Sequence, residues 1–246
     1  HSLVNLSRMN WKSLIPNGIT LSNLLCGVFS IYSVSQNSLI LASVFILAAA
    51  FLDFFDGFAA RALKVSGPLG AQLDSLADVI SFGVAPSFIA AHLAGAFNAE
   101  GTTSLLVYLP FIMALFAAFR LAKFNIDTDQ TEYFKGLPTP SNALFWLSIP
   151  LILEYGNPGS FAGKSIDAFS ESPLMIGLAS LLFGFLMISK IPLLALKFKS
   201  FGWRENKWKY LLIIFGLALL ALFQLAAIPI ILLLYLIFSS IHFYQN

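Results

Sequence analysis

Long apolar runs separated by short polar segments dominate the pattern of this sequence. A transmembrane helix needs about 20 mostly apolar residues, and only helices or closed barrels satisfy their backbone groups inside a bilayer. The pattern therefore predicts an all-α polytopic membrane protein with about eight transmembrane helices. The runs cover residues 19–34, 39–60, 70–94, 104–122, 141–153, 173–188, 210–225 and 228–243.

A short amphipathic segment precedes the first run. Apolar residues alternate there with Arg8 and Lys12, which is typical of a helix lying at the membrane interface. Pro16-Asn17-Gly18 predicts a break after it. We therefore divide the chain into an N-terminal interfacial segment (1–15), a six-helix core (16–192), and a basic loop with two C-terminal helices (193–246).

The composition supports a membrane protein. The 246 residues are 58% hydrophobic and only 11% charged, whereas soluble domains carry about 25% charged residues. A net charge of +2, with no basic patch interleaved with base-stacking aromatics, argues against a nucleic-acid partner. The single cysteine, Cys26, excludes an internal disulfide.

The distribution of cations predicts the orientation. If the N-terminus is cytoplasmic, every one of the 14 Lys and Arg residues except Lys164 falls on the cytoplasmic side of the eight-helix arrangement. Such a bias is the usual determinant of topology. We expect a multi-pass protein of the cell membrane in which the polar junction between runs 39–60 and 70–94 faces the cytoplasm.

Four carboxylates flank this junction. Asp53 and Asp56 lie three residues apart at the end of one run, and Asp74 and Asp78 lie four apart at the start of the next. Residues at these spacings share a helix face, and helices joined by a short loop are neighbours. The four acids are therefore expected to meet near the cytoplasmic surface.

These acids require compensation, because each costs roughly 2.5–3.5 kcal/mol at the centre of a bilayer. Arg61 and Lys64 are the nearby cations, and two bases do not balance four acids. Clustered oxygen ligands suit Mg²⁺, Mn²⁺ or Ca²⁺. A metal site is the favoured interpretation; a structural polar cluster and a proton or ion pathway are the alternatives.

The spacing of these residues also matches a known motif. Residues 53–78 fit D-x2-D-G-x2-A-R-x8-G-x3-D-x3-D throughout, and in this the sequence resembles the CDP-alcohol phosphotransferase family. The resemblance implies a six-helix core, a homodimer, and two divalent ions, Mg²⁺ or Mn²⁺. It also implies transfer of a substituted phosphate from a CDP-linked donor to an acceptor hydroxyl, with release of CMP.

The resemblance also assigns roles to the acids. It implies that Asp53, Asp56 and Asp74 bind the metal ions, and that Asp78 is both a ligand and the general base on the acceptor hydroxyl. Such a base must reach within hydrogen-bond distance of the proton that it takes.

Six residues are candidates for binding the donor. Small residues on the acidic face let a nucleotide approach the helix, an arginine can grip a phosphate bidentately, and glycines loosen the loop that follows. An asparagine in the first run could act in binding or simply join helices. These candidates are Asn23, Gly57, Ala60, Arg61, Gly67 and Gly70.

Later segments predict the acceptor. Residues 77–86, 119–125 and 134–140 are similar to the branch of this family that transfers a phosphatidyl group from CDP-diacylglycerol to L-serine. Serine needs a cation for its carboxylate. The candidate serine-binding residues are Arg120, Lys123, Asn125, Lys135 and Thr139.

Several alternatives remain at this point. The three cations could instead contact membrane-lipid headgroups, and Lys123 stands where this branch would be expected to carry arginine, so it lacks the planar fork. The acceptor could be glycerol 3-phosphate or inositol phosphate. A cation or proton transporter would also place acids inside the membrane.

Overall fold

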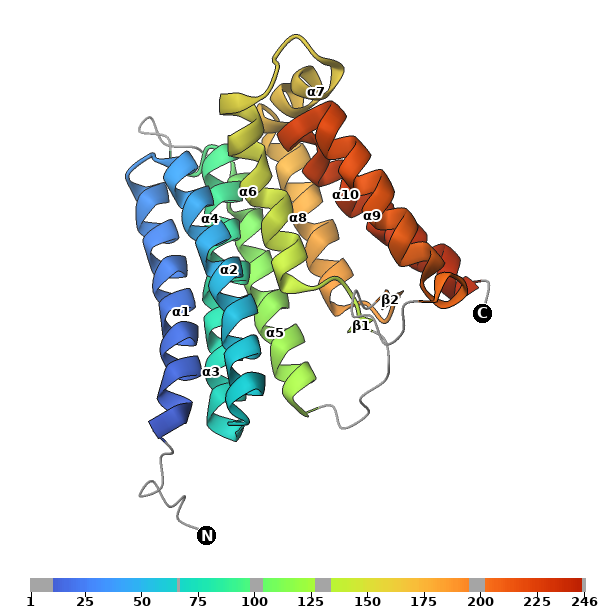
Figure 1. The fold of residues 1–246 in the computed structure, drawn as a ribbon. Coiled ribbons are helices and arrows are strands. Elements are labelled where there is room, and N and C mark those ends of the chain that lie inside the picture. Colours follow the sequence, from blue (N-terminus) through green and yellow to red (C-terminus); the bar gives the residue numbers. More distant parts are fainter. Residues whose placement is uncertain (1–10, 66, 98–103, 127–133, 195–201, 245–246) are drawn as a thin grey trace.

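The structure is a computed structural model that describes residues 11–65, 67–97, 104–126, 134–194 and 202–244. It is a bundle of long helices with a small α7 at the end opposite the start of α3 (Figure 1). The helices are α1 (Leu14–Ser35), α2 (Leu39–Leu63), α3 (Pro68–Asp78), α4 (Ala85–Leu93), α5 (Ile112–Ile126), α6 (Thr139–Tyr155), α7 (Phe161–Ser170), α8 (Pro173–Ile188), α9 (Trp203–Phe223) and α10 (Ala227–Tyr244).

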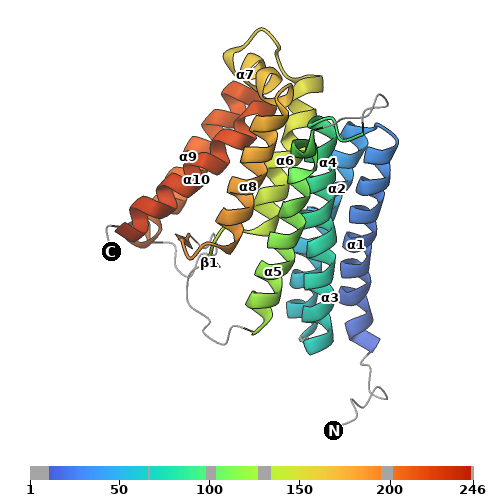
Figure 2. The same cartoon turned by 180° about the vertical axis from the view of Figure 1, so that it is seen from behind.

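Helices α1 and α2 form an antiparallel pair along one side of the bundle (Figures 1 and 2). The turn between them contains Asn37 at φ 57°, a left-handed conformation that asparagine tolerates. The short 3₁₀ helix η2 (Trp11–Ser13) leads directly into α1. The break expected at Pro16 is therefore wrong: this proline lies in the first turn of α1, where a missing N–H costs little. The remaining residues expected in the interfacial helix, 1–10, lie outside the described residues.

The third apolar run forms one continuous helical segment with a local defect. A π-helical turn, η3 (Val79–Val84), joins α3 to α4, and the whole segment covers Pro68–Leu93. Such turns are frequent at functional sites. Here α1 approaches η3 so closely that a Cβ on Gly27 would lie 2.5 Å from Ser81 Oγ. The Ser81 hydroxyl donates to the Asn23 carbonyl at 3.0 Å.

The second half of the chain completes the bundle. The 3₁₀ helix η4 (Leu105–Phe111) leads into α5, and η5 (Gln224–Ala226) connects α9 to α10. Two short strands, β1 (Phe134–Lys135) and β2 (Pro192–Leu193), pair antiparallel between α5–α6 and α8–α9. They were not predicted from the sequence.

The membrane character of the chain is confirmed, but the count of eight crossings is not. Among the described residues, five helical segments are long and apolar enough to cross a membrane, or six if α7 and α8, bent by 94°, count as one. One of the five, Asn206–Tyr244, contains both α9 and α10. Helices α6 and α8 have only 17 and 16 residues. Eight crossings therefore stay a prediction.

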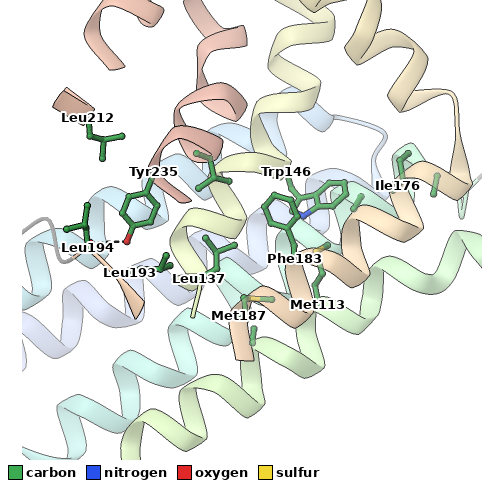
Figure 3. Close-up of a cluster of buried hydrophobic side chains, with 14 of the residues drawn as sticks. Met113, Leu137, Trp146, Ile176, Phe183, Met187, Leu193, Leu194, Leu212 and Tyr235 are labelled. Atoms are coloured by element: carbon green, nitrogen blue, oxygen red, sulfur yellow. Dashed lines mark hydrogen bonds between the residues drawn. The ribbon is translucent and has the colours of Figure 1, made fainter. Parts of the chain in front are cut away.

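Two apolar cores hold the bundle together. One joins α1, α2, α4 and α6 around Ile46, Phe82 and Leu147. The other joins α5, α6 and α8 to β2, α9 and α10, with Trp146, Phe183 and Tyr235 among its members (Figure 3). The C-terminal hairpin α9–α10 therefore packs onto the six-helix core.

Candidate metal and substrate site

The acids of α2 and α3 meet, as the spacing predicts. Asp53, Asp56 and Asp74 each offer a carboxylate oxygen, and these three atoms lie within 4.8 Å of one another. Asp56 is buried, whereas the other two are partly exposed. Three carboxylates this close repel one another unless cations or protons lie between them.

Asp78 extends this cluster inward along α3. Its side chain is only 9% exposed, lies close enough to Asp53 to share a hydrogen bond, and interacts electrostatically with Asp56 and Asp74 as well. Its buried Oδ1 has no hydrogen-bond partner within the described parts of the chain. Asp78 Oδ1 is thus available to a ligand, and it lies beside the cluster of the other three carboxylates.

Thr20 of α1 holds one of these acids in place. Its hydroxyl donates to Asp56 Oδ2 at 2.6 Å, and both side chains are 4% exposed. The hydroxyl is also 3.0 Å from the Pro16 carbonyl; since it has one proton, the shorter bond to the carboxylate is the stronger. The sequence motifs assign no role to Thr20, because its partner lies 36 positions away.

Arg61 and the small residues of α2 border the cluster. A Cβ on Gly57 would lie 3.4 Å from Arg61 Nη1, so the guanidinium folds back over this glycine. Arg61 is exposed and its charge interacts with Asp56. Ala60 is partly exposed one turn beyond Gly57. This surface combines an accessible cation with little side-chain bulk.

The two later glycines and Asn23 differ in their surroundings. Gly67 is the extended residue before α3, but Gly70 lies inside the first turn of α3 rather than in the expected loop. Asn23 is fully buried, and neither polar atom of its side chain has a partner among the described residues. Its amide is therefore available to a ligand or to water.

Two of the five acceptor candidates lie inside the bundle. Arg120 of α5 is partly buried, its charge interacts with Asp78, and its buried Nε has no partner in the described part of the protein. Thr139, the first residue of α6, is 1% exposed, and its hydroxyl is likewise unpaired there. Arg120 thus presents an unpaired polar atom near Asp78, and Thr139 presents one at the start of α6, counting partners among the described residues.

The other three candidates lie at the surface. Asn125 is exposed and bridges α5 to α3, donating to Gln72 Oε1 at 3.3 Å and to Ser75 Oγ at 3.0 Å. Lys123 is exposed on α5, and Lys135 is exposed on β1. Serine binding by these residues stays a prediction.

The donor set fits a hard divalent cation. Carboxylate oxygens from two helices converge, one is oriented by a hydroxyl, and a fourth acid has a buried unpaired oxygen. Such ligands suit Mg²⁺ or Mn²⁺, and metal ions held by carboxylates are a common means of handling phosphate groups. Fold and site together define an integral membrane protein with an acidic cation site suited to phosphoryl transfer.

Comparison with known families identifies the group within this class. The family model described as "CDP-alcohol phosphatidyltransferase" matches residues 13–182, which include α1 to α7 and most of α8. The chain belongs to the CDP-alcohol phosphatidyltransferase family, whose members use divalent metal.

Its relatives include several proteins that share one name, CDP-diacylglycerol–serine O-phosphatidyltransferase. The one from Bacillus subtilis (strain 168) is 35% identical over 186 residues, covering 72% of this chain and 88% of the relative. The one from Helicobacter pylori (strain 26695) is 33% identical over 233 residues, covering 93% and 90%. The one from Saccharomyces cerevisiae is 34% identical over 154 residues, covering 56% and 54%.

Proposed function

We propose that this protein transfers the phosphatidyl group of CDP-diacylglycerol to the hydroxyl of L-serine, forming phosphatidylserine and CMP. The observation that carries the proposal is the convergence of three carboxylates within 4.8 Å beside the buried Asp78. The names of the bacterial relatives that match most of the chain support serine as the acceptor. Family membership favours a transferase over a cation or proton transporter.

Asp53, Asp56, Asp74 and Asp78 would hold the metal, which we expect to be two Mg²⁺ or Mn²⁺ ions. Four carboxylates carry a charge of −4, which two divalent ions would balance. When bound, such ions supply charge neutralisation at the pyrophosphate and stabilise the leaving oxygen.

The donor's nucleotide half is expected to bind over the accessible side of α2. Gly57 and Ala60 leave room for it, and the Arg61 guanidinium, already in electrostatic contact with Asp56, can bind a phosphate oxygen pair. Gly67, Gly70 and Asn23 are the remaining candidate contacts. The two acyl chains would continue into the bilayer.

Asp78 is the proposed general base. In this reaction it takes the proton of the serine hydroxyl, whose oxygen attacks the phosphorus that bears diacylglycerol. The bond from that phosphorus to the bridging oxygen breaks, and CMP leaves with the bond's electron pair. The buried and unpaired Oδ1 of Asp78 suits this role, because it can accept a proton without first breaking another hydrogen bond.

Arg120 is the favoured partner of the serine carboxylate. Its charge already interacts with Asp78, so serine held by this guanidinium would bring its hydroxyl toward the base. The unpaired hydroxyl of Thr139 is a candidate for orienting the amine or carboxylate. Lys123, Asn125 and Lys135 are candidate contacts nearer the surface.

We further propose that the protein is a homodimer of the cell membrane with this site facing the cytoplasm. The bias of Lys and Arg across the apolar runs supports this orientation. Both the water-soluble serine and the nucleotide of the donor would then reach the acids from the cytoplasm.

A radiolabelled-serine assay tests the reaction. Purified protein in detergent is incubated with CDP-diacylglycerol and Mg²⁺ or Mn²⁺, and labelled lipid and CMP are quantified. We expect equal amounts of both products, and loss of both on chelation. CMP release with glycerol 3-phosphate or inositol phosphate but not with serine would overturn the acceptor assignment, and metal flux into liposomes without CMP release would overturn the transferase.

A further inference from the structure

The C-terminal hairpin contacts the core through one face of α10. The family match ends at residue 182, so α9 and α10 lie beyond it. Nevertheless Leu232, Tyr235 and Ser239 of α10 are buried. Their spacing of three and four residues places them on one helix face. Figures 1 and 2 show this hairpin at an angle to the other long helices, and α10 packs against α6 and β2.

Two side chains of α10 bind the same backbone unit. The Tyr235 hydroxyl donates to the Leu194 carbonyl at 3.0 Å (Figure 3). The Leu194 N–H donates to Ser239 Oγ at 3.2 Å. Leu194 is 5% exposed, so neither of its backbone groups could find water instead. An unpaired buried backbone group is costly. The two bonds therefore fix the chain directly after β2.

The end of α8 and the residue before β2 in turn hold the segment that leads into α6. Gly136 donates its N–H to the Ile191 carbonyl at 2.9 Å, and Leu137 donates to the Leu186 carbonyl at 2.9 Å. Gly136 has φ 76°, and a Cβ there would lie 2.5 Å from the Met187 carbonyl oxygen. The segment is thus clamped against the end of α8 and has little freedom to move alone.

This clamped segment, residues 135–139, carries two of the acceptor candidates. Lys135 pairs with Pro192 across the strands, and Thr139 begins α6 with a buried, unpaired hydroxyl. A displacement of β2 would therefore act directly on Lys135 and, through the connecting residues 136–138, on Thr139.

Tyr235 has a second connection to the site. Its phenol interacts electrostatically with the Arg120 guanidinium, and the charge of Arg120 interacts with Asp78. Tyr235 is 8% exposed and lies in the apolar core with Leu137 and Leu193. Tyr235 is thus hydrogen-bonded to the chain after β2 and is near enough to Arg120 for their charges to interact.

We propose that α10 is part of the acceptor site, and that Tyr235, assisted by Ser239, is a positioning residue that holds residues 135–139 where they bind the acceptor, close to Arg120. This proposal rests on the proposed function for the location of the acceptor pocket. Since the family match ends before the hairpin, we expect α10 to affect acceptor binding rather than the transfer step.

The test separates KM from kcat in Tyr235→Phe. This variant keeps the ring in the core and removes only the hydroxyl. We expect KM for serine to rise roughly 3- to 10-fold, as for loss of one hydrogen bond, while KM for CDP-diacylglycerol and kcat stay within about twofold. Ser239→Ala should raise KM for serine in the same direction, and it carries the test if Tyr235→Phe does not remain folded in detergent.

Ser240→Ala is the matched control, because the Ser240 hydroxyl is exposed and bonds only its own helix, at Leu236 O. It should leave both KM values unchanged. A merely structural role of Tyr235 would lower the active fraction, and hence the apparent kcat, with an unchanged KM for serine; that result would overturn the proposal. If the wild-type protein forms no phosphatidylserine, the proposed function fails separately. KM of the same variants is then measured for the acceptor, glycerol 3-phosphate or inositol phosphate, that supports CMP release.

Discussion

Replacing Thr20 by valine tests whether the acid cluster is a metal site oriented from α1. The substitution keeps the branched shape but removes the donor of the 2.6 Å bond to Asp56 Oδ2. Hydrogen bonds to charged groups contribute about 1.5–3 kcal/mol, and the partners of metal ligands typically affect metal affinity by about 10- to 100-fold. At about 1.4 kcal/mol per factor of ten, these two estimates agree. We therefore expect Thr20→Val to weaken Mn²⁺ binding by about 10- to 100-fold.

Two measurements check this value. Mn²⁺ binding is titrated directly by the loss of the free-ion electron paramagnetic resonance signal, and the Mn²⁺ concentration for half-maximal activity is determined in parallel. Thr20→Ser retains the hydroxyl and should bind Mn²⁺ within about threefold of wild type. Ser22→Ala, which removes an exposed hydroxyl bonded to Gly18 O of its own helix, should change nothing. Wild-type Mn²⁺ affinity in a folded Thr20→Val protein would refute the reasoning.

Two other substitutions and a chelation experiment complete the set. Asp78→Asn should abolish turnover while CDP-diacylglycerol still binds, because the proton acceptor is lost but the donor contacts remain; substantial activity would remove Asp78 from catalysis. Gly27→Ala should destabilise the protein by about 1–3 kcal/mol, since the new Cβ would lie 2.5 Å from Ser81 Oγ. Gly18→Ala in the same helix meets nothing within 4 Å and should keep or slightly raise the thermal midpoint, because alanine favours a helix over glycine. Chelation should abolish activity, and Mg²⁺ or Mn²⁺ should restore it; full activity after complete chelation would contradict a metal requirement.

The acidic hairpin could be predicted from the sequence because its information is local. Spacings of three and four residues place Asp53 with Asp56, and Asp74 with Asp78, on single helix faces, and the short connection makes the two helices neighbours. The long apolar runs likewise located most helices. The helix boundary near Pro16 was wrong, because proline tolerates the first turn of a helix as readily as it breaks one.

The remaining features depend on contacts between distant positions. Nothing in the local pattern distinguishes the π turn Val79–Val84 from the α-helix around it. The strands are two residues long, which is too short for a period-two pattern. They pair because the end of α8 lies beside the start of α6. The role of Thr20 depends on its hydrogen bond to Asp56, 36 positions away. Asn125 bonds to Ser75 of α3, a contact that the residues around Asn125 in the sequence do not indicate.

The two sides of the site therefore differ in how the chain builds them. The cluster of carboxylates comes from one hairpin and lies inside the region shared with the family. The candidate acceptor side comes from α5, the start of α6, the paired strands and α10, which are up to about a hundred positions apart along the chain. Substitutions in α10 can therefore change acceptor binding while the carboxylates stay in place. This separation would let one metal-dependent transfer chemistry serve different acceptor alcohols, with acceptor binding adjusted by α10, which lies outside the family match.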